Sequence, residues 1–401
     1  MPFSPGKLLV LQGGGPTPVL NATLFGVLEE ARGHFASVLG ARFGIEGLLK
    51  GDWIDLSTLS QSELSLLRLT PGASLGTTRH KPPETDYDRL IEQFRRHDVR
   101  SLLLIGGNGS LRGAHVIAGA ADRAGYEMSV LGLPKTVDND IPSTDRCPGY
   151  GSAAKYVAQS VRDLGMDVRA LPQPVSIYET MGRGVGWLAA ASVVAKLDDD
   201  SAPHLVYLPE VPFDSGRFIA SVDRVVKRLG WAVVVVSEGL CVADGRPVFE
   251  VTDAAQRDAL GRALPGGVGQ HLASLVTKEL KIRCRHEKPG LCGRASMLHL
   301  SQQDLADAEL VGRAGVRGAI ERRHAQAVSL RPLSEGPASY DYIPLDHAAG
   351  DRHIPAEWLI NGDLPVSNGF VQYVSRIVGE LMPALEPLAL RPRVDFGALP
   401  G

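Results

Sequence analysis

The alternation of short apolar runs with helical patterns is the feature that most limits how this chain can fold. Apolar runs typical of buried strands occur at Leu8–Leu11, Ser101–Ile105, Ser129–Leu133, Val175–Glu179 and Trp231–Val236, with helical periodicity between them. A further short strand is expected at Lys281–Cys284, and residues 331–365, which hold many prolines and glycines, are expected to form surface loops. Strands that alternate with helices form parallel sheets covered by helices on both faces. The sequence therefore predicts an α/β protein, and 401 residues are enough for two such sheets.

Two of the expected strands run directly into glycine-rich turns that precede a helix. The first turn reads Gln12-Gly13-Gly14-Gly15-Pro16-Thr17, and the second reads Gly106-Gly107-Asn108-Gly109-Ser110. A turn of this kind presents backbone N–H groups and a helix N-terminus, which together favour a phosphate. Neither turn matches the P-loop or the GxGxxG pattern, so each one alone could also be a tight turn without a ligand.

A third strand is followed by charged side chains. The run Ser129–Leu133 ends at Pro134, and Lys135, Thr136, Val137, Asp138, Asn139 and Asp140 come next. Open α/β sheets bind their ligands beyond the carboxyl ends of the strands. Lys135, Asp138 and Asp140 could therefore face an anion and its metal ion. The alternative is a polar loop in which one aspartate caps the next helix.

Composition and charge narrow the class of protein. A formal net charge of −3 gives no electrostatic reason to expect nucleic acid or an anionic membrane as a partner. No apolar run approaches the roughly 18 residues that a membrane-spanning helix needs. Cys147, Cys241, Cys284 and Cys292 are scattered, so we expect reduced thiols and a cytoplasmic protein.

Four stretches together resemble the phosphofructokinase family. They are Gly13–Thr17, Gly106–Ser110, Pro134–Asp140 and Met181–Arg183, and their order and content are most similar to the subgroup that uses pyrophosphate as phosphoryl donor. The resemblance extends from about Lys7 to about Leu381. It implies two doubly wound parallel-sheet domains with the active site in the cleft between them. The donor domain would comprise residues 1–149 and 293–370, and the sugar-phosphate domain residues 150–292 and 371–401.

The resemblance also implies roles for individual residues. Asp138 matches the general base that takes the proton from the sugar 1-hydroxyl, and Lys135 and Arg183 are the other expected catalytic residues. Arg285 and Arg294 match two arginines that grip the 6-phosphate. The remaining expected substrate contacts are Thr136, Val137, Met181, Gly182 and Glu238.

On the donor side, the expected contacts are Gly14, Arg79, Asn108 and Gly109. The expected cofactor is Mg²⁺, which takes oxygen ligands and bridges phosphates, and Asn108 and Asp140 are its expected ligands.

Some positions depart from the family pattern. Many pyrophosphate enzymes have aspartate where this chain has Gly109, whereas Asn108 and Lys135 agree with that subgroup. Pro174 replaces an arginine that bacterial ATP enzymes donate across the subunit interface, and Leu291 replaces a histidine or tyrosine of the sugar site. Gly109 agrees with the ATP enzymes, so the phosphoryl donor stays open between pyrophosphate and ATP.

The expected function is reversible transfer of a phosphoryl group from pyrophosphate to fructose 6-phosphate by a homodimer or homotetramer. The alternatives are an ATP-dependent 6-phosphofructokinase, a nucleotide kinase or dehydrogenase, and a regulatory subunit that only binds sugar phosphate. A nucleotide kinase would not explain Met181–Arg183 together with Arg285 and Arg294. A regulatory subunit would be expected to lose Lys135 or Asp138, and both are present.

Overall fold

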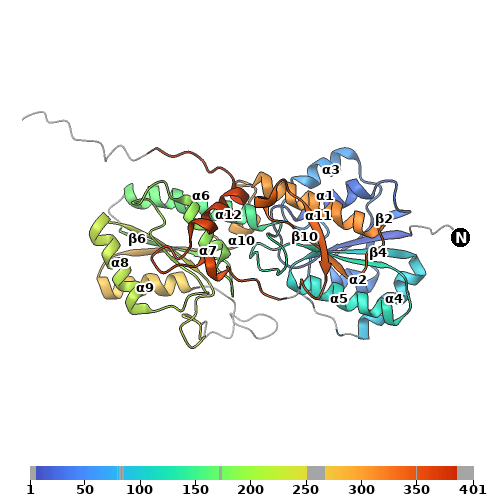
Figure 1. Ribbon diagram of the computed structural model, residues 1–401, viewed down its shortest axis with the longest axis horizontal. Helices are drawn as coiled ribbons and strands as arrows, with labels where there is room; N and C mark the ends of the chain where they lie inside the picture. Colours follow the sequence, from blue (N-terminus) through green and yellow to red (C-terminus); the bar gives the residue numbers. More distant parts are fainter. Residues whose placement is uncertain are drawn as a thin grey trace, which may run out of the picture.

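The computed structural model describes residues 6–78, 80, 83, 85–170, 174–250, 267–348 and 350–385. Within them the chain forms two lobes that lie side by side along the longest axis, each built around one sheet (Figure 1). The prediction of two helix-covered sheets is confirmed.

The larger sheet has seven strands in the order β11-β10-β5-β4-β1-β2-β3. The strands are β1 (Lys7–Gln12), β2 (Ser37–Ala41), β3 (Trp53–Asp55), β4 (Val99–Gly106), β5 (Ser129–Pro134), β10 (Gln326–Leu330) and β11 (Tyr340–Pro344). The five inner strands are parallel, whereas the edge strands β3 and β11 pair antiparallel with their neighbours. The parallel centre agrees with the prediction, and the antiparallel edges were not predicted.

Helices cover both faces of the larger sheet because its inner strands are apolar on both sides. Leu8 and Val10 point to one face, where they share a hydrophobic cluster with α1 (Leu20–Ala31), α3 (Gln61–Arg68) and α11 (Gln302–Ile320). Leu9 and Leu11 point to the other face. There they share a cluster with α2 (Ile45–Lys50), α4 (Thr85–His97) and α5 (Asn108–Arg123).

The smaller sheet is wholly parallel, in the order β7-β8-β6-β9. Its strands are β6 (Val175–Thr180), β7 (Leu205–Tyr207), β8 (Ala232–Ser237) and β9 (Cys284–Glu287). One face carries α6 (Tyr150–Ala170), α7 (Trp187–Ala191) and α12 (Asn368–Val378), and the other carries α8 (Ser215–Leu229) and α9 (Val268–Leu280). The short helices are η1 (Ser192–Ala195), α10 (Leu291–Ala295), η3 (Leu333–Glu335) and η4 (Ala356–Trp358).

Each sheet has one point at which the chain stops adding strands on one side and continues on the opposite side. Open α/β sheets bind ligands at such topological switch points. In the larger sheet the switch point lies between β1 and β4, whose carboxyl ends lead into the two glycine turns. In the smaller sheet it lies between β6 and β9. The chain passes from β5 through α6 into the smaller sheet, and it returns through α11 to β10.

After β11 the described chain packs against the other lobe. Helix α12 packs in the hydrophobic cluster of the smaller sheet, and Ile354 and Val366 join the same cluster. The domain boundaries stay a prediction. What the contacts establish is that the last described helix ties the end of the chain to the lobe of the smaller sheet.

Two segments differ from what the sequence patterns indicated. A strand was expected at Lys281–Cys284, but Lys281 ends α9 with a φ of 58°, so the strand begins only at Cys284. Residues 331–365 were expected to be surface loops, yet they contain the edge strand β11. Short strands with mixed polarity give little periodic signal.

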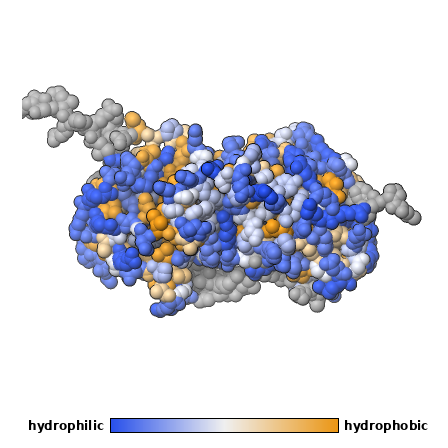
Figure 2. Space-filling view, viewed as in Figure 1, coloured by the Kyte–Doolittle hydropathy of each residue, from blue (hydrophilic) through white to orange (hydrophobic). Residues whose placement is uncertain are grey.

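The surface in Figure 2 is mainly hydrophilic, and the hydrophobic residues visible there gather mostly on the lobe of the smaller sheet. Among the described residues, none of the helices combines the length and the apolar character that a membrane span requires.

Candidate active site between the two sheets

The turn after β1 forms one wall of the candidate site. Gly13 donates its N–H to the carbonyl of Ile105 at 2.8 Å, which holds the turn against the end of β4. Gly14 has a φ of 77°, a left-handed conformation that glycine adopts without strain. Thr77 donates its hydroxyl to the Gly14 carbonyl at 2.8 Å. The turn is therefore fixed from both sides before any ligand binds.

Lys135 lies directly against this turn. Its ammonium donates to the carbonyl of Gly15 at 2.7 Å, and its side chain is buried. Burial and, to a smaller extent, the nearby Arg294 guanidinium lower the pKa of Lys135 to about 8, while Asp138 and Asp140 act in the opposite direction. Lys135 is thus a cation held between the glycine turn and two carboxylates.

Asp138 is a half-buried carboxylate with neighbours from both lobes. Burial raises its pKa to about 7, and Asp140 and Glu238 contribute to the rise. Lys135 and Arg183 lower the same pKa and so favour the ionised form. The Asp138 N–H donates to the Thr136 hydroxyl at 3.1 Å, which gives Thr136 a role in shaping the loop. A carboxylate with a pKa near neutrality suits proton transfer.

Asn108 and Asp140, the two expected metal ligands, lie within hydrogen-bond distance of each other. The Asn108 amide donates to one carboxylate oxygen of Asp140 at 3.0 Å. The other oxygens, Asn108 Oδ1 and Asp140 Oδ1, are buried and have no hydrogen-bond partner among the described residues. Burial raises the pKa of Asp140, against hydrogen bonds from Thr136 and Asn108. Two orphaned oxygens beside a glycine-rich turn fit Mg²⁺, which prefers oxygen ligands.

The carboxyl ends of β6 and β8 form the opposite wall. The Ser237 hydroxyl donates to the Gly182 carbonyl at 2.6 Å, and the Glu238 N–H donates to the Thr180 carbonyl at 3.0 Å. A Cβ on Gly239 would lie 1.8 Å from the Arg183 carbonyl oxygen, so only glycine fits there. These contacts hold the Met181–Arg183 loop against the end of β8.

Electrostatic coupling connects the two walls. Arg183 lowers the pKa of Asp138 and also that of Glu238, whose pKa burial otherwise raises. Glu238 in turn raises the pKa of Asp138. Charged groups from β5, β6 and β8 therefore act on one another within one site.

An ion pair between a buried glutamate and an exposed lysine at this wall was missed by the sequence interpretation. Glu179 is 1% exposed, pairs with Lys288 at 3.2 Å and accepts the N–H of Gly269 at 2.7 Å. Lys288 lowers the pKa of Glu238. Glu179 stands two residues before Met181 in the sequence, but its pairing with Lys288 depends on β9 lying beside β6, which no local sequence pattern predicts.

The two arginines expected at the sugar 6-phosphate lie in different places. Arg294 Nη1 is 3.1 Å from the position of a Cβ on Gly15, so its guanidinium covers the glycine turn beside Lys135. Arg285 lies on β9 in register with Ser176. Among the described residues, no hydrogen bond or ion pair joins the Arg285 side chain to Lys135, Asp138 or Arg183. The structure brings Arg294 to the site and leaves Arg285 at the edge of the smaller sheet.

Three further expected residues complete the comparison. Val137 packs in the hydrophobic cluster of the smaller sheet, so only its backbone is available to a substrate. Around Gly109 the space is open, with no heavy atom of the described residues within 4 Å of a Cβ built there. Arg79 lies outside the described residues.

Comparison with known proteins agrees with this geometry. The family model described as "Phosphofructokinase" matches residues 7–305. The pyrophosphate–fructose 6-phosphate 1-phosphotransferase of Xanthomonas campestris pv. campestris is 41% identical over 84% of this chain and 82% of its own length.

Solved structures give the same result for the whole fold. The pyrophosphate-dependent phosphofructokinase of Marinobacter aquaeolei has a TM-score of 0.83 and 31% identity, covering 95% of this chain and 94% of its own. That of Nitrosospira multiformis has a TM-score of 0.85 and 29% identity, covering 99% of this chain and 98% of its own. With a family match over most of its length and these relatives, the chain belongs to the phosphofructokinase family.

Proposed function

We propose that this protein transfers a phosphoryl group reversibly from pyrophosphate to the 1-hydroxyl of D-fructose 6-phosphate. The products are fructose 1,6-bisphosphate and phosphate, an interconversion that serves both glycolysis and gluconeogenesis. The observation that carries the proposal is the coupling of Asp138 to Lys135 on one wall and to Arg183 and Glu238 on the other. A base between two cations is what transfer between two phosphate-bearing substrates requires.

Phosphoryl transfer requires little covalent chemistry from the protein itself. A new bond forms between the sugar O1 and one phosphorus of pyrophosphate, the bridging P–O bond breaks, and phosphate leaves. Asp138 takes the hydroxyl proton, for which its raised pKa and the cations that keep it ionised are suited. The rest of the catalysis is positioning and neutralisation of charge.

The donor is held by the glycine turn and Lys135. Backbone N–H groups at Gly14 and Gly15 are suited to phosphate oxygens, whereas the Gly13 N–H is bonded to Ile105. The Lys135 ammonium neutralises charge on the leaving phosphate. Mg²⁺, held by Asn108 Oδ1 and Asp140 Oδ1, would add further neutralisation of the phosphates. Gly14, Arg79, Asn108 and Gly109 are the donor contacts that we propose.

The sugar phosphate is held by the opposite wall. We assign Glu238 to a sugar hydroxyl, Met181–Arg183 and Thr136–Val137 to the sugar, and Arg285 and Arg294 to the 6-phosphate. A planar guanidinium suits a phosphomonoester. The position of Arg294 beside Gly15 makes contact with the donor the competing assignment for this residue.

The competing function is an ATP-dependent 6-phosphofructokinase. Gly109 has open space around it and carries no carboxylate that would repel the α-phosphate of ATP. This observation favours the ATP-dependent alternative. The buried Lys135 and the orphaned oxygen of Asn108 favour pyrophosphate, as do the relatives. A regulatory subunit without catalysis is disfavoured, because base and lysine are both retained.

We further propose that the protein works in the cytoplasm as a homodimer or homotetramer, with no nucleic-acid or membrane partner. The test of the proposed function is formation of fructose 1,6-bisphosphate by the purified protein from fructose 6-phosphate with either donor, at matched Mg²⁺. Formation of product with pyrophosphate supports the proposal. Formation of product only with ATP would leave the family assignment unchanged and refute pyrophosphate as the donor.

A further inference from the structure

Asn139 stands between the two carboxylates of the site, Asp138 and Asp140, in an unusual backbone conformation. Its φ is 55°, in the left-handed region that asparagine tolerates better than most residues. The side chain is fully buried, and both its oxygen and its nitrogen make a hydrogen bond. Its Oδ1 accepts the N–H of Cys147 at 3.0 Å, and its Nδ2 donates to the Tyr373 hydroxyl at 3.0 Å.

Tyr373 makes the second half of this connection. It lies on α12, a helix that packs in the hydrophobic cluster of the smaller sheet. Its hydroxyl accepts from Asn139 and donates to the Asp145 carbonyl at 2.7 Å. One hydroxyl therefore joins both limbs of the loop that follows β5 to a helix of the opposite lobe.

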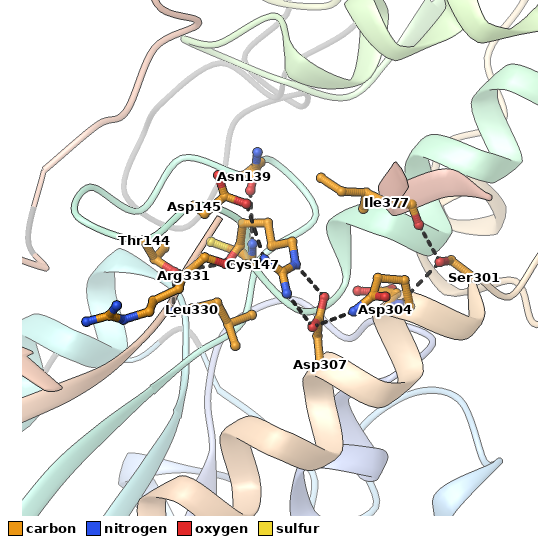
Figure 3. Close-up of polar contacts among 12 residues, drawn as sticks. Asn139, Thr144, Asp145, Cys147, Ser301, Asp304, Asp307, Leu330, Arg331 and Ile377 are labelled. Carbon is orange, nitrogen blue, oxygen red and sulfur yellow. Dashed lines mark hydrogen bonds and ion pairs between the residues drawn. The ribbon is translucent and has the colours of Figure 1, made fainter. Parts of the chain in front are cut away.

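The far limb of this loop is firmly fixed. Arg146, 1% exposed, makes two bonds to the carboxylate of Asp307 on α11, at 2.6 and 2.7 Å. It also donates to the carbonyl of Arg331 at 2.7 Å. Figure 3 shows Asn139 and Cys147 at one side of this network, with Asp307 on α11 at the other. Moving the Arg146 guanidinium out of these contacts would leave a buried charge without its partner, which is energetically costly.

We propose that Asn139 and Tyr373 form a positioning pair that fixes Asp138 and Asp140 for phosphoryl transfer. Neither side chain acts on the substrates. Asn139 attaches the carboxylate-bearing limb to the fixed limb at Cys147, and Tyr373 attaches both limbs to α12. The inference rests on the proposed function, since it assigns Asp138 as the base. A positioned base loses much of its effect when the geometry is relaxed.

The first experiment removes only the hydroxyl of Tyr373. We expect Tyr373→Phe to lower kcat about three- to tenfold, the effect of one ordinary hydrogen bond, and to leave both KM values within about twofold because no substrate contact is removed. The matched control is Tyr342→Phe. Tyr342 is also half-buried and also donates to a backbone carbonyl, that of Ala314, at 2.7 Å. The control should keep wild-type kcat.

The second experiment tests whether the two residues act through one bond. Asn139→Gly keeps the left-handed backbone accessible and removes both side-chain bonds. If the pair is a unit, the double variant Asn139→Gly/Tyr373→Phe loses clearly less kcat than the product of the two single losses. Fully multiplicative losses, or a Tyr373→Phe variant with wild-type kcat, would overturn the inference.

A third measurement does not depend on catalysis. Amide hydrogen exchange at Cys147, whose N–H is bonded to Asn139, should be faster in Asn139→Gly than in the wild type and unchanged in Tyr342→Phe. Unchanged protection in Asn139→Gly would refute the positioning pair even if the wild type proved inactive. A wild type that forms no product from pyrophosphate, with faster exchange in the variant, would refute the proposed function alone.

Discussion

At the scale of single residues, the account depends most on Asp138. Asp138→Asn removes the base and retains the size of the side chain. We expect kcat to fall by about two to four orders of magnitude, the usual contribution of a positioned base, with little change in KM for fructose 6-phosphate. Steady-state kinetics of the pure variant checks this. Turnover close to that of the wild type would remove Asp138 from the mechanism.

Lys135 predicts a pH dependence. Burial lowers its pKa to about 8. Because the protonated form is the useful one, kcat/KM for pyrophosphate should fall as pH rises through about 8. Below neutrality it should also fall, because Asp138, with a pKa of about 7, becomes protonated.

Lys135→Arg isolates the first effect, since arginine stays protonated throughout this range. The ratio of kcat/KM in Lys135→Arg to that in the wild type should rise with pH above about 8. The titration of the substrates cancels in this ratio. A ratio that stays flat from neutrality to pH 10 would contradict the role of the lysine charge.

Arg294 decides between two assignments. If it grips the 6-phosphate, Arg294→Ala should raise KM for fructose 6-phosphate about ten- to a hundredfold, as expected for a lost charge-assisted bond of roughly 1.5–3 kcal/mol. The KM for pyrophosphate would change little. A larger rise in the KM for pyrophosphate would assign Arg294 to the donor instead, in keeping with its contact beside Gly15.

At the scale of elements, the start of α6 depends on a carboxylate from another helix. Asp304 on α11 accepts the N–H groups of Gly149 and Ser152 at 2.8 and 2.9 Å, and it is 2% exposed. Asp304→Ala leaves two buried donors unsatisfied. We expect the free energy of unfolding to fall by about 1–3 kcal/mol for each donor, measured by chemical denaturation.

Asp214→Ala is the control for this prediction. Asp214 caps α8 through the Arg217 N–H at 2.7 Å, but from an exposed position. Its loss should cost only about 1 kcal/mol. Equal losses in the two variants would show that burial of the donors at α6 is not what makes Asp304 important.

The elements also show what the sequence could predict. The inner strands β1, β4, β5, β6 and β8 were predicted because each is a continuous apolar run, such as Ser129–Pro134, which is buried throughout. The inner strands β2 and β10 were missed, because Gly40 and Ser329 interrupt their apolar runs. Edge strands such as β11 were missed, since Tyr340–Pro344 is partly exposed and gives no apolar run. The strand expected at Lys281–Cys284 begins only at Cys284, because Lys281 ends α9 in a left-handed conformation that cannot belong to a strand.

The residues of the candidate site also fall into those that the sequence predicted and those that it missed. Lys135, Asp138 and the glycine turns follow strands directly, so the position of the strand predicted their neighbourhood. Tyr373 could not be found in this manner, because its partner Asn139 is 234 residues away in the chain. Contacts of that kind depend on how α12 packs, and no local pattern encodes them.

At the scale of the whole molecule, the site exists only because two lobes meet. Asp138 comes from the end of β5 in the larger sheet, and Arg183 and Glu238 come from the ends of β6 and β8 in the smaller one. Helix α12 ties the loop of Asp138 to the opposite lobe through Tyr373. On the proposed function, the donor and the acceptor bind to different walls of this one site.

The central claim is that this site transfers phosphate from pyrophosphate to fructose 6-phosphate. The most direct test is the ratio of kcat/KM for pyrophosphate to kcat/KM for ATP, measured on the wild-type protein with saturating fructose 6-phosphate and equal Mg²⁺. The buried Lys135 beside the glycine turn predicts a ratio clearly above one. A ratio below one would contradict the pyrophosphate assignment.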